Sequence, residues 1–323
     1  MGSPSPPPRT ALYMPASSAR MLAKGPGLDA DAILADLEDA VAPEAKAAAR
    51  VAAVEAFGGL DYGHRLRVLR VNGADTPWHA DDVAAVAEAR PDAVLLPKVG
   101  SADDLARFAD ALDAADVADT VRVWAMLETL ASTLALPGLA RAAEPGTGTP
   151  RLAAFCVGGN DLAFEAGLPV PTARATLLPW LMGFLAAARG AGAAILDGVW
   201  NDHADTAGFA RDCAASAASG MDGRTLVHPA QIEIANRAFS PNASEIEDAR
   251  RTVDAFADPA AAGRGAIALD GRMLERLHLE MAHRTLARAR RAGAGTANHT
   301  TTDPDAAPAA ANPPPAATDI DTD

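Results

Sequence analysis

The chain has 323 residues and a formal net charge of −14, with 42 acidic against 28 basic side chains. This excess of negative charge argues against a nucleic acid or an anionic membrane as a partner, because both repel an acidic surface. Hydrophobic residues make up 49% of the chain and aromatic residues only 4%, so Ala, Leu and Val must fill the core. No apolar stretch has the length of a membrane span, and the Pro-rich start lacks the apolar centre of a signal peptide.

The two cysteines, Cys156 and Cys213, show neither a metal-type spacing nor a disulfide framework. We interpret both as small buried residues, which suits a reducing compartment. A cytoplasmic location is therefore expected.

Eight short apolar runs recur along the chain, and polar or charged residues follow nearly all of them. A strand buried on both faces of a parallel sheet reads as such a continuous hydrophobic run. The predicted strands are Ala11–Met14, Ala32–Leu37, Leu66–Val71, Ala93–Leu96, Val121–Leu127, Leu152–Val157, Ala193–Leu196 and Thr225–Val227.

The stretches between these runs are rich in Ala, Leu, Arg and Glu, which favour helix. Alternation of strand and helix implies a parallel sheet with right-handed crossovers, and eight repeats favour closure into a (β/α)8 TIM barrel. The predicted helices are Ala42–Phe57, Asp81–Ala89, Asp103–Ala114, Leu130–Ala143, Arg174–Ala191 and Gly208–Ala218.

Four segments are expected along the chain: a flexible leader over residues 1–9, a TIM-barrel catalytic domain over 10–239, a C-terminal helical extension or lid over 240–291, and a disordered tail over 292–323. The tail consists mostly of Ala, Pro, Thr, Asp and Asn, with few apolar anchors.

The extension is predicted to contain two helices. The first is Pro241–Phe256, with Ser244 as its N-cap and Glu247 three residues later. The second is a basic amphipathic helix, Gly271–Arg291.

A (β/α)8 barrel carries its chemistry on the loops at the C-terminal ends of its strands. Glu128 follows the fifth run and Asp161 follows the sixth. Ends of neighbouring strands converge, so these two carboxylates can share one hard cation, and Mg²⁺ is commonly held by one or two carboxylates together with water. The alternative is that Asp161 caps a helix over Leu162–Ala166.

Arg70 ends the third run and is costly at a barrel mouth without an anionic partner. Its guanidinium suits a substrate carboxylate or a developing enolate oxygen, and an ion pair with Glu38 or Asp39 is the alternative, which can coexist with that role. Asp36, Glu38 and Asp39 form a dense acidic cluster. Neighbouring like charges raise one another's pKa, so some of these carboxylates must be paired or solvated. We therefore interpret the cluster as holding an Arg, a Lys or metal-bound water next to the site.

Two further features lie near the predicted strand ends. His228, in Leu-Val-His-Pro, is interpreted as a structural histidine rather than a base. Gly158 and Gly159 leave room for backbone to approach a ligand. The chain contains no P-loop, dinucleotide fingerprint or zinc signature.

Nine segments carry a resemblance. They are Leu12–Pro15, Ala30–Pro43, Lys46 with Ala49 and Arg50, Arg70–Gly73, Leu96–Val99, Met126–Thr129, Gly159–Ala163, Leu196–Val199 and Thr225–Ile232. Together they resemble the CoA ester lyases related to the citrate lyase β subunit, within the HpcH/HpaI aldolase superfamily, of the malyl-CoA, β-methylmalyl-CoA or citramalyl-CoA lyase type. The match spans roughly residues 10 to 290.

The resemblance implies a Mg²⁺-dependent lyase that reversibly cleaves a 3-hydroxyacyl-CoA, such as malyl-CoA, into an acyl-CoA and a 2-oxo acid such as glyoxylate. It implies Mg²⁺ on Glu128 and Asp161, with Mg²⁺ acting as a Lewis acid, and the 2-oxo acid against Glu128 and Arg70. Arg20, Lys24 and Lys98 become candidates for the CoA phosphates or for the electrostatics of the mouth. A homotrimer, or a multiple of it, is implied as well.

Related lyases take a catalytic acid or base from a carboxylate in a Gly-x-Met-x-Asp context, which often reaches a neighbouring subunit. In this chain Glu275 stands where that Asp is usual, and Asp270 is a second candidate nearby. Alternatives to the lyase are a malyl-CoA thioesterase, a CoA-independent pyruvate aldolase, and a non-catalytic acyl-CoA-binding subunit of a lyase complex.

Overall fold

The computed structural model describes residues 7–144, 149, 151–170, 174–258 and 263–296. The expected flexible leader and disordered tail lie for the most part outside these ranges.

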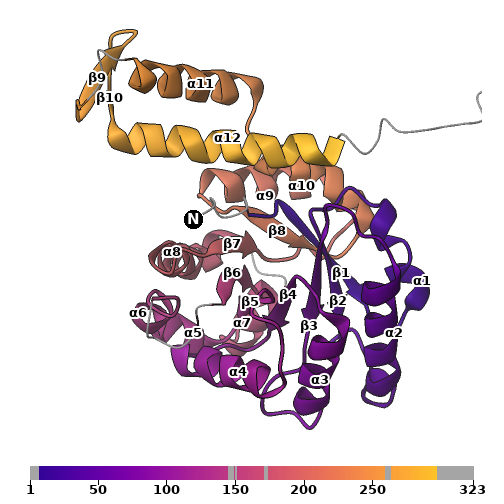
Figure 1. The fold of residues 1–323 in the computed structure, drawn as a ribbon. Helices are drawn as coiled ribbons and strands as arrows, with labels where there is room; N and C mark the ends of the chain where they lie inside the picture. Colours follow the sequence, from indigo (N-terminus) through magenta and orange to yellow (C-terminus); the bar gives the residue numbers. More distant parts are fainter. Residues whose placement is uncertain (1–6, 145–148, 150, 171–173, 259–262, 297–323) are drawn as a thin grey trace, which may run out of the picture.

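Eight parallel strands close into a barrel in the order in which they occur in the sequence (Figure 1). This confirms the predicted (β/α)8 architecture, and each predicted run agrees with its strand to within two residues at either end. The strands are β1 Thr10–Pro15, β2 Ala32–Asp36, β3 Leu66–Arg70, β4 Ala93–Leu96, β5 Arg122–Leu127, β6 Leu152–Val157, β7 Ala194–Asp197 and β8 Gly223–Leu226.

Helices surround this barrel (Figure 1). The α-helices are α1 Ala19–Leu22, α2 Lys46–Gly59, α3 His79–Ala89, α4 Ala102–Ala114, α5 Leu130–Leu134, α6 Leu136–Leu139, α7 Gly159–Glu165, α8 Arg174–Gly190, α9 Thr206–Ala218 and α10 Ile232–Phe239. Single 3-10 turns form η1 Gly25–Gly27, η2 Pro43–Ala45 and η3 Pro229–Gln231.

The single helix predicted over Leu130–Ala143 is wrong, because the chain forms two short helices, α5 and α6, in this region. Pro137 lies in the first turn of α6. Proline has no backbone N–H to donate to a preceding turn, so it ends one helix and is tolerated at the start of the next.

Two hydrophobic layers result from the alternation of side chains along the strands. Leu34, Leu95 and Trp124 belong to the cluster that fills the barrel interior. Ile33 and Phe155 belong to the larger cluster between the strands and the helices. Interior positions of such barrels are packed layers of side chains rather than a channel, so the chemistry must take place above them, at the strand ends.

After α10 the chain forms an arm beside the barrel, made of α11 Ala243–Ala257, β9 Ala266–Leu269, β10 Arg272–Glu275 and α12 Arg276–Thr296. In Figure 1, α11 and α12 run alongside each other, α12 lies next to α9 and α10, and the β9–β10 hairpin lies at the outer end of this arm, away from the barrel.

The helix predicted over Gly271–Arg291 is wrong in its first turn, where β10 forms instead. Asp270 and Gly271 have φ values of 50° and 74°, and they connect the antiparallel pair Leu269 and Arg272. A two-residue Asp-Gly loop with positive φ at both positions is the turn that matches the twist of a β-hairpin, so it overrides the helical pattern that follows.

The helix cap predicted at Ser244 with Glu247 is also misplaced. The capping box is formed by Asn242 and Glu245, two residues earlier, and each side chain accepts a hydrogen bond from the other residue's backbone N–H. Asn caps a helix at least as well as Ser does, and here Asn242 comes first in the chain.

Among the described residues, no helix combines the length and the apolar character that crossing a membrane requires.

The barrel closes where β8 pairs with β1 and contacts the residues just before it. The Arg224 N–H donates to the Arg9 carbonyl at 2.9 Å. A Cβ atom on Gly223 would lie 2.1 Å from the Pro8 carbonyl oxygen and 2.7 Å from that of Arg9. Both obstructing atoms belong to the backbone, so closure of the barrel depends on glycine at this position.

We therefore predict that Gly223→Ala lowers the free energy of unfolding by about 1–3 kcal/mol, as overpacking of a tight site does. Gly58→Ala on α2 is the matched control, since a Cβ there meets nothing within 4 Å. The control is expected to stabilise the protein by up to about 1 kcal/mol. Urea unfolding measures both changes, and equal effects at the two positions would contradict the proposed role of Gly223.

Candidate active site

Arg70 and Asp36 form a buried, two-pronged ion pair at the C-terminal ends of β3 and β2. The two residues are direct partners in the strand register. Nε of Arg70 donates to Oδ1 of Asp36 and Nη2 donates to Oδ2, both at 2.6 Å. The Asp36 carboxylate also accepts the backbone N–H groups of Glu38 and Ala40. The guanidinium is therefore held in one orientation by a carboxylate that is itself fixed.

The other members of the acidic cluster complete the surroundings of Arg70. Its Nη1 lies 2.7 Å from Oε2 of Glu38 and 3.5 Å from Oδ2 of Asp39. Its guanidinium carbon lies 4.9 Å from the centre of the Tyr13 ring. Burial opposes the charge of Arg70, but Asp36, Tyr13 and Glu38 together outweigh this effect and hold the pKa of Arg70 well above its usual value. The ion pairs considered for Arg70 are thus present, and the cluster serves to hold an arginine.

At Glu38 the effect of burial on the pKa is stronger than the effect of the neighbouring charge. Burial raises the pKa of Glu38 to about 8, although the charge of Arg70 works against that rise.

Glu128 and Asp161 converge on the ammonium group of Lys98. Glu128 directly follows β5, Lys98 follows β4, and Asp161 lies just after β6. Nζ of Lys98 is 3.3 Å from Oδ1 of Asp161 and 3.9 Å from Oε1 of Glu128. The two carboxylates from adjacent strand ends therefore face one cation, the ammonium of Lys98.

The backbone around Glu128 is shaped to receive its side chain. Oε1 of Glu128 accepts the backbone N–H of Lys98 at 2.8 Å, and Lys98 has a φ of 55°. A Cβ atom on Gly158 would lie 2.4 Å from the Cβ of Glu128. Glycine at position 158 is thus required for the Glu128 side chain to lie where it does.

Asp161 is the third residue of α7, and the N-cap position of that helix is Gly158. The alternative that Asp161 caps this helix is therefore wrong. In the first turn, its carboxylate still benefits from the positive end of the helix dipole.

These two carboxylates fit a hard divalent cation. Glu128 is buried, whereas the Asp161 side chain is 43% exposed and open to solvent. Burial raises the pKa of Glu128 to about 7, against the nearby charge of Lys98, so this carboxylate gains from a strong positive partner. Among the described residues no three His, Cys, Asp or Glu gather as a metal cluster. Two carboxylates facing a position already taken by a cation match the way in which proteins hold Mg²⁺ with water and substrate oxygens.

The remaining predicted site residues lie elsewhere. Arg20, on α1, and Lys24, just after it, are exposed in the segment that follows β1. Asp270 and Glu275 lie on the β9–β10 hairpin at the outer end of the arm (Figure 1). Asp270 forms an ion pair with Arg251 of α11. The fold thus separates the two candidate acids from Arg70 of the same chain.

Lys46 is a residue of the site region to which sequence reasoning assigned no role. Its buried ammonium donates to the carbonyls of Leu37 and Glu38 at 2.8 Å and to Oδ1 of Asn72 at 2.7 Å. Asn72 in turn donates to Asp82 of α3 at 2.6 Å. Lys46 therefore ties the loop that carries the acidic cluster to the neighbouring helices, and its only signal in the sequence was its place in a family motif.

His228 has the structural role expected of it. Its Nδ1 accepts the backbone N–H of Ala230 and so caps η3, and its ring stacks on His203 with centroids 4.6 Å apart.

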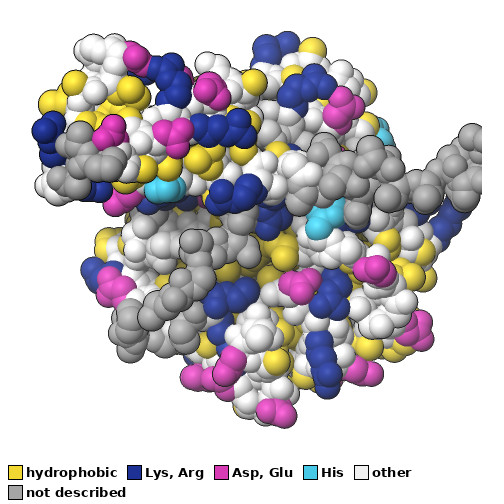
Figure 2. All heavy atoms as spheres, turned by 45° about the horizontal axis from the view of Figure 1, so that its top comes forward, with side chains coloured by type: hydrophobic (Ala, Val, Ile, Leu, Met, Phe, Trp, Pro, Cys, Tyr) yellow, Lys and Arg dark blue, Asp and Glu magenta, His cyan; other side chains and the backbone are white. Residues whose placement is uncertain are grey.

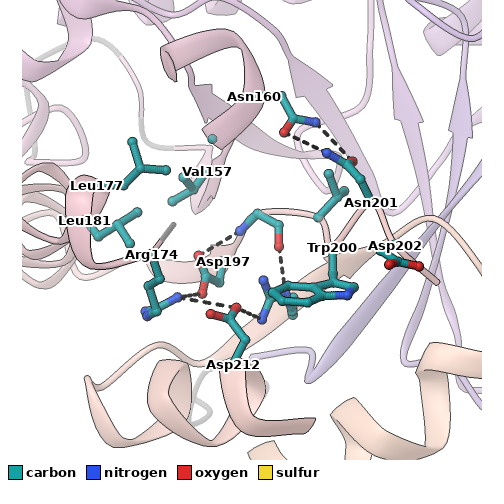
Figure 3. Close-up of a pocket in the computed structure, with 14 residues that line it drawn as sticks. Val157, Asn160, Arg174, Leu177, Leu181, Asp197, Trp200, Asn201, Asp202 and Asp212 are labelled. Carbon is teal, nitrogen blue, oxygen red and sulfur yellow. Dashed lines mark hydrogen bonds and ion pairs between the residues drawn. The ribbon is translucent and has the colours of Figure 1, made fainter. Parts of the chain in front are cut away.

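A cavity of about 450 Å³ lies near β6, β7 and α8 (Figure 3). Figure 3 shows Arg174, Asp197 and Asp212 pointing toward one another within it. Arg174 pairs with Asp197, and Arg224 pairs with Asp212 at 2.6 Å. The charges of Arg224 and Arg174 overcome the effect of burial and hold the pKa of Asp197 below its usual value.

Charged side chains of the outer layer line part of this cavity, and Gly159 and Asn160, next to Asp161, line it as well. Leu196 packs into the barrel interior, so Asp197, the next residue of β7, faces the surrounding helices. The polar residue after the seventh run thus belongs to an ion-pair network of the outer layer.

Replacing Lys46 tests how far the acidic loop depends on it. We predict that Lys46→Met lowers the free energy of unfolding by about 2–4 kcal/mol, because three buried oxygen acceptors lose their donor. Urea unfolding measures the change, with the exposed Lys24→Met as the matched control, which is expected to stay within about 0.5 kcal/mol of the native protein. A Lys46→Met protein as stable as the control would contradict this role.

Comparisons with known proteins agree with the geometry. A profile of the HpcH/HpaI aldolase/citrate lyase family matches residues 9–229. A (3S)-malyl-CoA thioesterase of Cereibacter sphaeroides is 44% identical over 281 residues, which cover 87% of this chain and 94% of that protein. An L-malyl-CoA/beta-methylmalyl-CoA lyase of the same organism is 32% identical over 292 residues, covering 84% of this chain and 91% of that protein.

A solved structure is similar as well. The protein CitE of Mycobacterium tuberculosis, in complex with magnesium, acetoacetate and coenzyme A, has a TM-score of 0.69 at 28% identity, covering 89% of this chain and 99% of that one. The family predicted from the sequence motifs is thereby confirmed: this chain belongs to the HpcH/HpaI aldolase/citrate lyase family.

Proposed function

We propose that this chain is a Mg²⁺-dependent enzyme acting on a 3-hydroxyacyl-CoA that carries a carboxylate, of the malyl-CoA type. The observation that carries the proposal is the convergence of Glu128 and Asp161 on one cation. Support comes from relatives named for malyl-CoA chemistry and from a similar structure that holds magnesium and coenzyme A.

In this proposal Glu128 and Asp161 hold the ion, which supplies a Lewis acid for the carboxylate and hydroxyl oxygens of the substrate. Arg70 supplies positive charge and N–H donors toward the oxygen that becomes negative in the reaction. Nη2 of Arg70 carries two N–H groups, and its bond to Asp36 uses one of them. Because Asp36 and Glu38 fix the guanidinium beforehand, little reorganisation is needed when charge develops.

The first reaction we propose is retro-aldol cleavage. A general base takes the proton of the hydroxyl group, the hydroxyl carbon becomes the carbonyl carbon of the 2-oxo acid, and the bond to the carbon next to the thioester breaks. The electron pair of that bond forms a thioester enolate, which Arg70 stabilises and which then takes a proton from an acid. With malyl-CoA the products are glyoxylate and acetyl-CoA.

We propose that the acid comes from the arm of a second copy of this chain, through Glu275 or Asp270. The hairpin holds both residues away from the barrel of its own chain (Figure 1). The arm exposes Met273, Leu277 and Met281 at 67%, 50% and 58%, and Figure 2 shows hydrophobic and basic side chains next to each other on it. An exposed apolar stretch of this kind marks an interaction surface. A ring of copies, such as a trimer, places each arm on a neighbour.

Arg20 and Lys24 are the cations we propose for the phosphates of CoA, and Lys98 is the cation we propose for the electrostatics of the mouth. Arg20 and Lys24 are exposed in the segment after β1, and Lys98 follows β4. Local positive groups attract an anionic cofactor even on a protein of net negative charge.

Hydrolysis of the malyl-CoA thioester is the second candidate. It is favoured by the 44% identity to a (3S)-malyl-CoA thioesterase, against 32% to a lyase. The metal carboxylates and Arg70 serve this reaction equally, since the oxyanion formed when water attacks the thioester carbonyl needs the same positive surroundings.

Product analysis distinguishes the two reactions. The protein is incubated with (3S)-malyl-CoA and Mg²⁺, and glyoxylate and free thiol are measured in parallel. Cleavage releases glyoxylate without free thiol, whereas hydrolysis releases free thiol without glyoxylate. Either result supports a Mg²⁺-dependent malyl-CoA enzyme. Turnover only of CoA-free hydroxy-oxo acids, or acyl-CoA binding without any turnover, would contradict the proposal.

We predict that Glu128→Gln and Asp161→Asn each lower kcat/KM at least about 100-fold and weaken Mg²⁺ binding, because each removes one anionic ligand. Isothermal titration of Mg²⁺ and the product assay measure the two effects. Asp110→Asn, an exposed aspartate on α4, is the matched control for charge and should leave both unchanged. Native Mg²⁺ affinity in both site variants would remove these residues from the metal site.

Mixing two inactive variants tests the proposed contribution of the arm. A Glu275→Ala, Asp270→Ala double variant and Glu128→Gln are each expected to have little activity. If the arm of one copy serves the barrel of another, then unfolding and refolding the two together restores part of the activity, up to about a quarter for random assembly with one neighbour. Full activity of the double variant would exclude the arm from the reaction, and inactive mixtures would argue against sharing between copies.

A further inference from the structure

We propose that Lys98 is an internal counter-cation of the metal site: its ammonium holds Glu128 and Asp161 together when no metal is bound, and a divalent ion displaces it. The inference rests on the proposed function, because it requires that the two carboxylates bind a metal. It assigns Lys98 a role distinct from binding the phosphates of CoA.

The ammonium of Lys98 lies close to both carboxylates of the proposed metal site. Nζ of Lys98 lies within 4 Å of both carboxylates, at 3.3 Å from Asp161 and 3.9 Å from Glu128. An ion shared by these two oxygens must occupy the same space between them. Two cations cannot share that space, since an ammonium and a divalent ion repel each other strongly at such distances.

The backbone of Lys98 stays in place when its side chain moves. The Lys98 N–H donates to Oε1 of Glu128 at 2.8 Å, and the next N–H, of Val99, donates to the Met126 carbonyl at 3.2 Å. Both bonds hold the chain in the left-handed conformation of Lys98, with its φ of 55°. A non-glycine residue keeps such a conformation only where the surroundings enforce it. The same residue thus offers Glu128 a fixed N–H and a movable ammonium.

The side chain has a route out of the site. It is 46% exposed, so its ammonium can move into solvent at the mouth without crossing the core. Lysine suits this movement, because it has a flexible four-carbon stem and its single charge is compact.

The first test measures Mg²⁺ affinity by isothermal titration without substrate. Lys98→Met removes the competing charge but keeps the backbone N–H, so we expect Mg²⁺ to bind about tenfold more tightly. Lys98→Arg keeps the charge and should stay within about threefold of the native affinity. Lys24→Met changes the net charge equally, away from the carboxylates, and should bind Mg²⁺ as the native protein does.

Thermal unfolding gives a second readout that does not depend on activity. Without metal, Lys98→Met should unfold at a lower temperature than the native protein, because its two carboxylates lack a cation. With saturating Mg²⁺ the difference should shrink or reverse. Lys24→Met should show neither change.

A third readout uses the native protein, so it stands even if the variants fail to fold. The chain has three lysines, Lys24, Lys46 and Lys98. Brief amine acetylation followed by peptide mass spectrometry should show more labelling of Lys98 with Mg²⁺ than without it. Exposed Lys24 should react equally in both conditions, and buried Lys46 should stay protected in both.

The outcomes separate the two proposals. Equal or weaker Mg²⁺ binding by Lys98→Met, or labelling of Lys98 that Mg²⁺ leaves unchanged, would overturn the counter-cation role while leaving the metal site intact. A native protein that binds no Mg²⁺ would overturn the proposed function itself.

Discussion

The arrangement of the barrel mouth depends on one constraint: carboxylates buried at the ends of parallel strands must face positive charge. Glu128 is almost fully buried beside Lys98 and Asp161, and Asp36 is buried against Arg70. An unpaired charge at either place would cost several kcal/mol. The fold meets this cost differently at the two places, with a rigid two-pronged guanidinium at Asp36 and a movable ammonium at Glu128. We infer that the first is a fixed part of the anion site and that the second is exchangeable for metal.

The places of the charged residues at this mouth could be predicted from the sequence because buried parallel strands are easy to recognise as apolar runs. Each strand is buried on both faces, so its run ends where the polar residues of the mouth begin. Glu128 and Asp161 therefore stood out as neighbours although 33 positions separate them. The acidic cluster around Arg70 was visible for the same reason, since Asp36 and Arg70 end adjacent strands and are partners in the register.

What the sequence did not reveal are features that depend on three-dimensional proximity or on a single turn. Lys46 has three acceptors from two distant segments, and no local pattern predicts such a set. The left-handed backbone of Lys98 follows from contacts with Glu128 and Met126, which propensity cannot foresee. Asp270 and Gly271 did carry a local signal, the Asp-Gly hairpin turn, but the long amphipathic pattern behind them favoured a helix. Their placement on a hairpin is what removes the candidate acids from their own barrel.

The central claim is that Glu128 and Asp161 share a divalent ion in the place of the Lys98 ammonium. The most direct measurement is an anomalous difference map from crystals of the native protein soaked in Mn²⁺, a divalent ion that takes oxygen ligands as Mg²⁺ does. The account predicts one strong peak between the two carboxylates, with the Lys98 side chain turned away toward the mouth. A peak bound by other residues, or none at the mouth while Lys98 still bridges both carboxylates, would contradict it.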